Sequence, residues 1–127
     1  MKFMTLVKSS EKNGPPPQAL MDAMEQLGKD ANASGQMVLS GGLYGSGYGG
    51  IRVRLDKGKI SMTDGPFTET KEVIGGFAVL QFDTREEAVE ACKSFMELHK
   101  KHWPGWEGES EMRQIYDDPT EVRSKGK

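Results

Sequence analysis

The sequence predicts an α+β protein in which two helices pack against an antiparallel sheet. Two segments have the roughly 3.6-residue apolar spacing of amphipathic helices, and six short segments have the alternation or apolar composition of strands. The chain has 127 residues, of which 35% are hydrophobic and 28% are charged. These totals are typical of one globular domain with a modest core. The sequence has no internal boundary and no repeat of fixed period.

The first strand and the first helix are expected near the N-terminus. Residues 3–7 form an apolar run that predicts a strand buried on both faces. Three prolines at 15–17 indicate that a helix starts there, because proline is well tolerated just inside a helix start. Gly35 is the expected C-terminal cap. The apolar stripe of this helix consists of Leu20, Met24, Leu27 and Ala31.

The middle of the chain predicts a β-hairpin. Residues 37–39 are expected to form a short strand, and a glycine-rich loop follows at 41–50. Residues 51–55 and 60–63 then alternate between apolar and polar side chains on either side of a tight turn at 56–59. The apolar side chains of the two strands can share one core face: Ile51, Val53, Leu55, Ile60 and Met62.

The second half of the chain predicts another strand–helix–strand unit. Residues 64–67 interrupt the strand pattern, because a Gly-Pro pair cannot continue a central strand. Residues 76–82 are expected to form a largely buried strand, and a last strand is expected at 111–116. Between them, Thr84 and Glu87 have the spacing of a capping box at a helix start. The apolar stripe of this helix consists of Ala88, Cys92, Phe95 and His99.

The predicted order of elements is β, α, β, β, β, β, α, β. Two strand–helix units therefore frame a central hairpin. Both helices can bury their apolar stripes on one face of the antiparallel sheet, which is a ferredoxin-like layout.

Charge and composition exclude several classes of function. The net charge is −2 and the pI is about 5.7, so no strong basic field is present and we expect no direct nucleic-acid binding. The longest apolar runs are far short of the ~20 residues that span a bilayer. The N-terminus has no signal-peptide pattern. Cys92 is the only cysteine, and its place on the helical stripe predicts a buried, unreactive thiol. Together these features predict a cytoplasmic protein.

The most specific motif is DGPFTETKE, which runs from Asp64 to Glu72 and is followed by Val73, Ile74 and a double glycine. This segment resembles the DGPF branch of the YCII-related family. Collinear similarity extends over residues 1–117, and residues 118–127 form a polar C-terminal tail.

The resemblance implies a ferredoxin-like domain that pairs into a dimeric α/β barrel, so we expect a homodimer with a cleft between sheet and loops. Family members are proposed to be enzymes because some carry a His–Asp pair in that cleft. Some are encoded with extracytoplasmic-function sigma factors. The histidine of the pair belongs on the first helix, and residues 16–34 contain none. The pair therefore cannot be carried over to this chain.

Ionisable side chains gather in the DGPF motif, on a loop of the kind that often carries function. In the first hypothesis, Asp64 acts as a general base and Lys71 stabilises charge, with Glu72 beside them. In the alternative, Asp64 bonds the backbone of its own turn, while Lys71 and Glu72 are solvated. Phe67 either walls a pocket or fills the core. Arg113 either binds a ligand carboxylate or pairs with a nearby acid such as Glu111.

The remaining candidates predict neither a metal site nor a cofactor. His99 and His102 lie at a helix end without a third fixed ligand. The glycines at 45–50 precede a strand rather than a helix, so this loop is not expected to bind phosphate. Trp103 and Trp106 are expected either to anchor the second helix to the sheet or to lie in a dimer interface.

Three functions are consistent with these residues. The first is an enzyme-like protein or a binder of a small polar metabolite in the dimer cleft. The second is a non-catalytic sensor or interaction module that works beside a transcription factor, such as a sigma factor. The third, a glyoxalase-like metalloenzyme, requires several well-placed histidines that the chain lacks.

Overall fold

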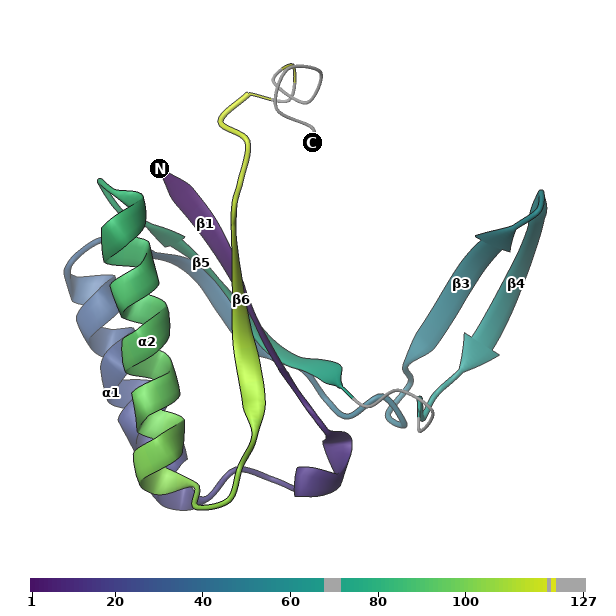
Figure 1. The fold of residues 1–127 in the computed structure, drawn as a ribbon, viewed down its shortest axis with the longest axis horizontal. Helices are drawn as coiled ribbons and strands as arrows, with labels where there is room; N and C mark the ends of the chain where they lie inside the picture. The colour runs from purple at the N-terminus through teal and green to yellow at the C-terminus, as the bar shows by residue number, and fades with distance from the viewer. Residues whose placement is uncertain (68–71, 119, 121–127) are drawn as a thin grey trace.

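The computed structural model describes residues 1–67, 72–118 and 120. Within these residues, six strands and two α-helices follow each other in the predicted order, with one short 3-10 helix in addition (Figure 1). The elements are β1 (Lys2–Ser9), η1 (Glu11–Asn13), α1 (Gln18–Ala33), β2 (Met37–Gly42), β3 (Ile51–Asp56), β4 (Lys59–Asp64), β5 (Val73–Gln81), α2 (Arg85–His102) and β6 (Gly108–Gln114).

Four strands form the main sheet in the order β2-β5-β1-β6. All neighbouring pairs are antiparallel, and β1 pairs with both β5 and β6. Each helix connects two strands that flank a third one, which is the ferredoxin-like connection predicted from the element order. The α+β class is therefore confirmed. The last strand begins and ends earlier than the predicted range of 111–116.

The core lies on the side of the main sheet that faces α1 and α2. Phe3 at the start of β1, Phe82 after β5 and Ala88 in α2 are buried together. The ring centroids of Phe3 and Phe82 are 6.5 Å apart in a tilted arrangement, a favourable geometry for two aromatic rings. Three partly buried side chains surround this cluster: Leu80, Ala91 and Met112.

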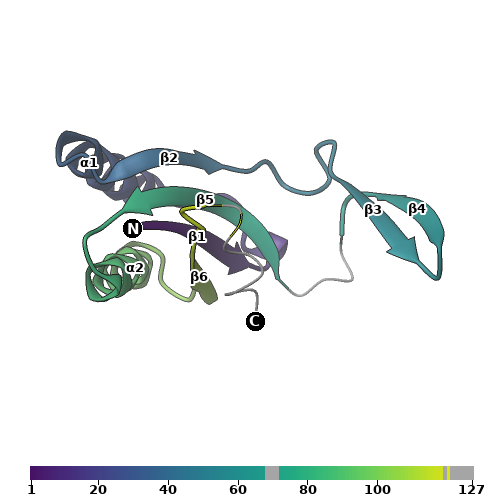
Figure 2. The same ribbon diagram turned by 90° about the horizontal axis from the view of Figure 1, so that it is seen from above.

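The opposite face of the main sheet, which we call the open face, is covered by no helix or strand of the described residues (Figures 1 and 2). The register places Met4 and Leu6 of β1 and Phe77 and Val79 of β5 on this face. All four are only half-buried. The prediction that residues 3–7 are buried on both faces is therefore wrong for a single chain, because the two helices cover one face only.

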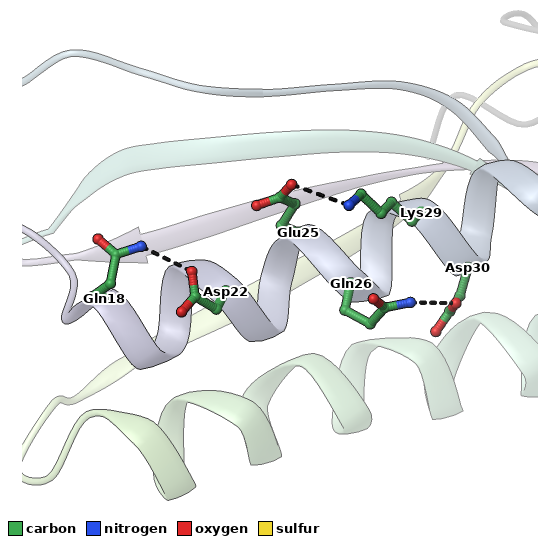
Figure 3. Close-up of polar contacts among 6 residues, drawn as sticks. All are labelled: Gln18, Asp22, Glu25, Gln26, Lys29 and Asp30. Atoms are coloured by element: carbon green, nitrogen blue, oxygen red, sulfur yellow. Dashed lines mark hydrogen bonds and ion pairs between the residues drawn. The ribbon is translucent and has the colours of Figure 1, made fainter.

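The ends and the exposed surface of α1 explain how the helix forms. Pro17 occupies the N-cap position and makes no side-chain cap. At the C-terminal end, Gly35 has a φ of +76°, which lets the chain leave the helix as predicted. Three polar pairs, each spaced four residues apart, stabilise the exposed surface by about 0.2–0.5 kcal/mol each. Figure 3 shows them: Gln18–Asp22, Glu25–Lys29 and Gln26–Asp30.

A side-chain cap defines the start of α2. The Oγ1 of Thr84 accepts a hydrogen bond from the backbone N–H of Glu87 at 3.2 Å, as the capping-box spacing predicts. The last turn carries basic side chains next to the negative end of the helix dipole. In the part of the chain that the structure describes, no helix is both long and apolar enough to cross a bilayer.

β3 and β4 form a separate two-stranded sheet that projects from the main sheet (Figure 2). Val53 pairs with Met62 and Leu55 with Ile60, which confirms the predicted hairpin. Its apolar side chains share one face, but they do not join the core of the chain. They are 50–73% exposed, because β3 and β4 lie apart from the main sheet: Ile51, Val53, Leu55, Ile60 and Met62.

Replacing Thr84 with alanine removes the acceptor at the start of α2. We expect the free energy of unfolding to fall by about 1 kcal/mol. Thr84→Ser keeps the hydroxyl and should remain close to the wild type. Denaturant unfolding followed by circular dichroism measures both variants. An equal loss of stability in the two variants would show that the hydroxyl does not cap the helix.

Candidate functional site

The DGPF segment forms the junction between the hairpin and the main sheet. Asp64 is the last residue of β4, and its side chain is exposed. The ring centroid of Phe67 lies 3.8 Å from the guanidinium carbon of Arg52, which is a cation–π contact. Phe67 is half-buried and does not belong to the core cluster, which was one of its two predicted positions. It supports the base of the hairpin instead.

Ser46 in the glycine-rich loop connects this junction by hydrogen bonds to η1, which follows β1 of the main sheet. Its backbone N–H and its hydroxyl donate to the carboxylate of Glu11 in η1, at 2.6 and 2.8 Å. Its Oγ also accepts a hydrogen bond from the N–H of Phe67 at 2.9 Å. Gly50 and Gly65 pass so close to the Ser46 carbonyl that a Cβ at either position would collide with it. The predicted loop is present at residues 43–50, because β2 continues through Gly42, and a strand rather than a helix follows it.

A charged cluster lies on the open face where β1 pairs with β6. The Nζ of Lys8 is 2.5 Å from the Oε1 of Glu111, and the two side chains are 28% and 34% exposed. The hydrogen bond from Lys8 to Glu111 is the main cause that raises the pKa of Lys8, and the charges of Glu109 and Glu72 raise it further. The same hydrogen bond lowers the pKa of Glu111, with a smaller effect from Arg113. Both groups therefore stay charged over a wide pH range.

The structure places the predicted site residues in two regions. Asp64 and Phe67 lie at the hairpin junction, whereas Glu72 and Arg113 act electrostatically on the Lys8–Glu111 pair. No hydrogen bond or ion pair between described residues joins the two regions. The remaining predicted residue, Lys71, lies outside the described residues.

Sequence reasoning missed Lys8, Glu11 and Ser46. The alternation of β1 contained a signal for the lysine, because Lys8 shares a face with Met4 and Leu6. Glu11 and Ser46 gave no such signal, since they are 35 residues apart and meet only when the glycine-rich loop folds against η1.

Aromatic rings surround His99 at the end of α2. His99 is buried, and its Nδ1 donates to the carbonyl of Phe95 at 2.9 Å. Its ring also contacts Trp106, which packs against Trp103, so both tryptophans lie at the helix end. In the described part of the chain, no three side chains of His, Cys, Asp or Glu are grouped so that they could hold a metal ion. The thiol of Cys92 is half-buried, and burial raises its pKa, which disfavours a reactive thiolate.

Residues 1–95 match the family profile of the YCII-related domain. The chain belongs to the YCII-related family. The matched range runs from β1 into α2 and contains the whole DGPF motif, so the motif and the profile support the same assignment. No curated protein matches the chain.

The Lys8–Glu111 pair should make stability depend on pH. Because the folded pKa of Glu111 is lowered, its contribution is present above the ordinary glutamate pKa of about 4.3 and is lost as the pH falls through the folded value. Because the pKa of Lys8 is raised, the contribution of Lys8 is lost only as the pH rises through a value above its ordinary one of about 10.4.

We therefore expect Glu111→Gln to be less stable than the wild type at neutral pH and to approach the wild type in acid. Denaturant unfolding between pH 3 and pH 8 measures this difference. Glu107→Gln, at an exposed neighbouring glutamate, is the matched control and should follow the wild type throughout. A difference that stays constant across the whole range would contradict the role of the ion pair.

Proposed function

We propose that this YCII-family protein is a homodimer that binds a small polar metabolite between the open faces of two chains. The observation that carries this proposal is the open face itself. In one chain it combines uncovered apolar side chains with a partly buried pair of opposite charges. An apolar surface next to a few fixed polar groups is the usual composition of a metabolite site.

The apolar part of the open face supports burial by a second copy of the chain. Leu39 of β2 lies beside Val79 and is 57% exposed, while Leu6 and Phe77 extend the apolar surface over β1 and β5. Strands that are apolar on both faces are typical of sheets that are covered on both sides. Two such faces packed together would give the dimeric α/β barrel that the family resemblance implies, with about 10 Å between the sheets.

The charges on β6 support the same arrangement. Glu109, Glu111 and Arg113 alternate with inward-facing residues along the strand and lie on the open face. A two-fold axis places the same patch of both copies in contact, so a patch that carries both signs can pair with itself. The surface is therefore electrostatically suited to a homodimer.

The projecting hairpin is the second uncovered apolar surface. An isolated two-stranded hairpin is marginally stable in water, and an exposed apolar patch commonly marks an interface. We assign the apolar face of the hairpin to the second copy as well. If the chain is a monomer, this face is instead available to a different protein, which corresponds to the interaction-module hypothesis.

Within the dimer, the charged cluster would orient the metabolite. Arg113 offers a guanidinium that suits a ligand carboxylate, and Glu72 and Glu109 favour a positively charged or hydrogen-bond-donating group. A catalytic role for Asp64, as a base assisted by Lys71, remains a prediction. It requires the hairpin junction to meet the ligand when two chains pair.

Leu6→Lys should convert a dimer into a monomer, because it places an unpaired charge in the proposed interface. Light scattering after gel filtration should give the wild type twice the 14.0 kDa mass of one chain, and the variant that mass alone. Ser61→Lys, on the polar face of the hairpin, is the matched control and should remain dimeric. A monomeric wild type would contradict the proposal.

Arg113→Ala should weaken binding of a carboxylate-bearing metabolite by about tenfold or more, since it removes a charge-assisted hydrogen bond. A thermal-shift screen of small amino and hydroxy acids identifies the ligand, and titration calorimetry then compares wild type, Arg113→Ala and the hairpin control Arg54→Ala. If Asp64 is a base, Asp64→Asn should bind this ligand normally but not turn it over. Equal affinities of the wild type and Arg113→Ala would exclude the charged cluster as the site.

A further inference from the structure

A cavity of about 840 Å³ lies between the main sheet and the helices, on the side opposite the open face. Thr5, Val7 and Ala78 form its floor on β1 and β5, and α1 and α2 contribute Met24 and Phe95 to its lining. Its volume falls within the roughly 300–1,000 Å³ range of small-molecule pockets. It is separated from the charged cluster by the sheet.

The distribution of side-chain size along the sheet explains why the cavity exists. The bulky core residues Phe3 and Phe82 fill the interior at one end of β1. Toward the other end, the inward-facing positions of β1 and β5 carry Thr5, Ala78 and Gly76. These short side chains do not reach the helices. A space of this size between the sheet and the helices is large enough to accept a small molecule.

The lining of the cavity selects against charged ligands. Most of the lining surface is carbon, and no lysine or arginine of the described residues contributes to it. Glu11 reaches the cavity rim, but its carboxylate already accepts two hydrogen bonds from Ser46. An anion would find no counter-charge here and would lose its hydration, so an uncharged molecule is favoured.

His99 is a buried polar side chain in the lining of this largely apolar cavity. It lines the cavity, and its Nδ1 is already bonded to the Phe95 carbonyl. A carbonyl can only accept, so Nδ1 carries the proton and Nε2 of the neutral ring is an acceptor. Among the described residues, the hydrogen bond of Nδ1 is the only one that the His99 ring makes. The rings of Phe95 and Trp106, with centroids 4.8 and 4.5 Å from that of His99, provide an aromatic wall beside it.

We propose that this cavity binds an uncharged, largely apolar small molecule, whose hydrogen-bond donor is accepted by Nε2 of His99. The expected chemical class is an aromatic compound with one O–H or N–H group, such as a phenol, an indole or an arylamine. The proposal stands independently of the metabolite site on the open face, because the two sites lie on opposite faces of the sheet.

Two related fluorescent probes test the proposal directly. Phenylnaphthylamine is uncharged and carries one N–H, whereas anilinonaphthalene sulfonate has the same rings and an added negative charge. Phenylnaphthylamine should bind the wild type with one molecule per chain and should accept energy from Trp103 and Trp106. The sulfonate should bind about tenfold more weakly or not at all. Absence of energy transfer, or equal binding of the two probes, would overturn the proposal.

Substitutions locate the probe. Ala78→Phe fills the cavity from the sheet and should abolish binding, while circular dichroism confirms that the variant is folded. Ala31→Leu fills it from α1 and serves the same purpose if Ala78→Phe does not fold. Leu55→Ser lowers the apolarity of the hairpin and should leave binding unchanged. Loss of binding in Leu55→Ser but not in a folded cavity variant would place the probe on the hairpin and overturn the proposal.

The hydrogen bond to His99 is tested separately. His99→Phe keeps an aromatic ring but removes the acceptor, so phenylnaphthylamine should bind roughly three- to tenfold more weakly. A probe without a donor, such as diphenylhexatriene, should be affected less. His102→Phe makes the same change at a residue of α2 that does not line the cavity, and it should not alter either probe. An equal loss of affinity for both probes in His99→Phe would show that Nε2 accepts no hydrogen bond from the bound molecule.

Discussion

Apolar side chains occupy both faces of β1 and β5, and α1 and α2 can cover only one of them. On the covered side, Phe3 packs with Phe82 and Ala88 in the core. On the uncovered side, Leu6 and Phe77 lie half-buried. Burial of apolar surface is the main favourable contribution to folding and association, so an open apolar face is a strong driving force for pairing. The charged cluster lies on this same face, and its position links association to ligand binding in the function that we propose.

The junction at the base of the hairpin determines where the second apolar surface lies. The carboxylate of Glu11 accepts two hydrogen bonds from Ser46, and the Oγ of Ser46 accepts one from the backbone N–H of Phe67. Three segments far apart in sequence therefore meet at one point. The contact of Phe67 with Arg52 adds the start of β3 to this point. The DGPF motif therefore has a structural role that its position on a loop does not reveal. Its glycine is required by the close approach to Ser46, and its phenylalanine supports the hairpin base.

Local signals were sufficient to predict the type and order of the elements, although β5 and β6 each begin three residues earlier than predicted. The Thr84 cap, the Gly35 exit from α1 and the alternation of the hairpin each depend on residues close in sequence, and each is present in the structure. The observed strand order fits the predicted ferredoxin-like layout, because such connections leave few alternatives once the element order is known.

Long-range placement could not be predicted in the same way. The apolar face of the hairpin, including Val53 and Ile60, has the same pattern whether it is covered by its own chain or by another, so periodicity could not exclude the core. The bond between Lys8 and Glu111 joins residues 103 apart and depends on the register of β1 and β6. The cavity depends on the absence of bulk at Ala78 and Gly76 relative to the helix layer, which only the three-dimensional arrangement defines.

The central claim is that a second copy of the chain buries the open face. It is tested most directly by isotope-filtered nuclear Overhauser spectroscopy on an equal mixture of isotope-labelled and unlabelled protein. Contacts between different chains should appear at the methyl groups of Met4, Leu6 and Val79, and also at those of Val53 and Ile60 on the hairpin. If these methyl groups show contacts only within their own chain, the open face is not an interface, and the proposed dimeric site does not exist.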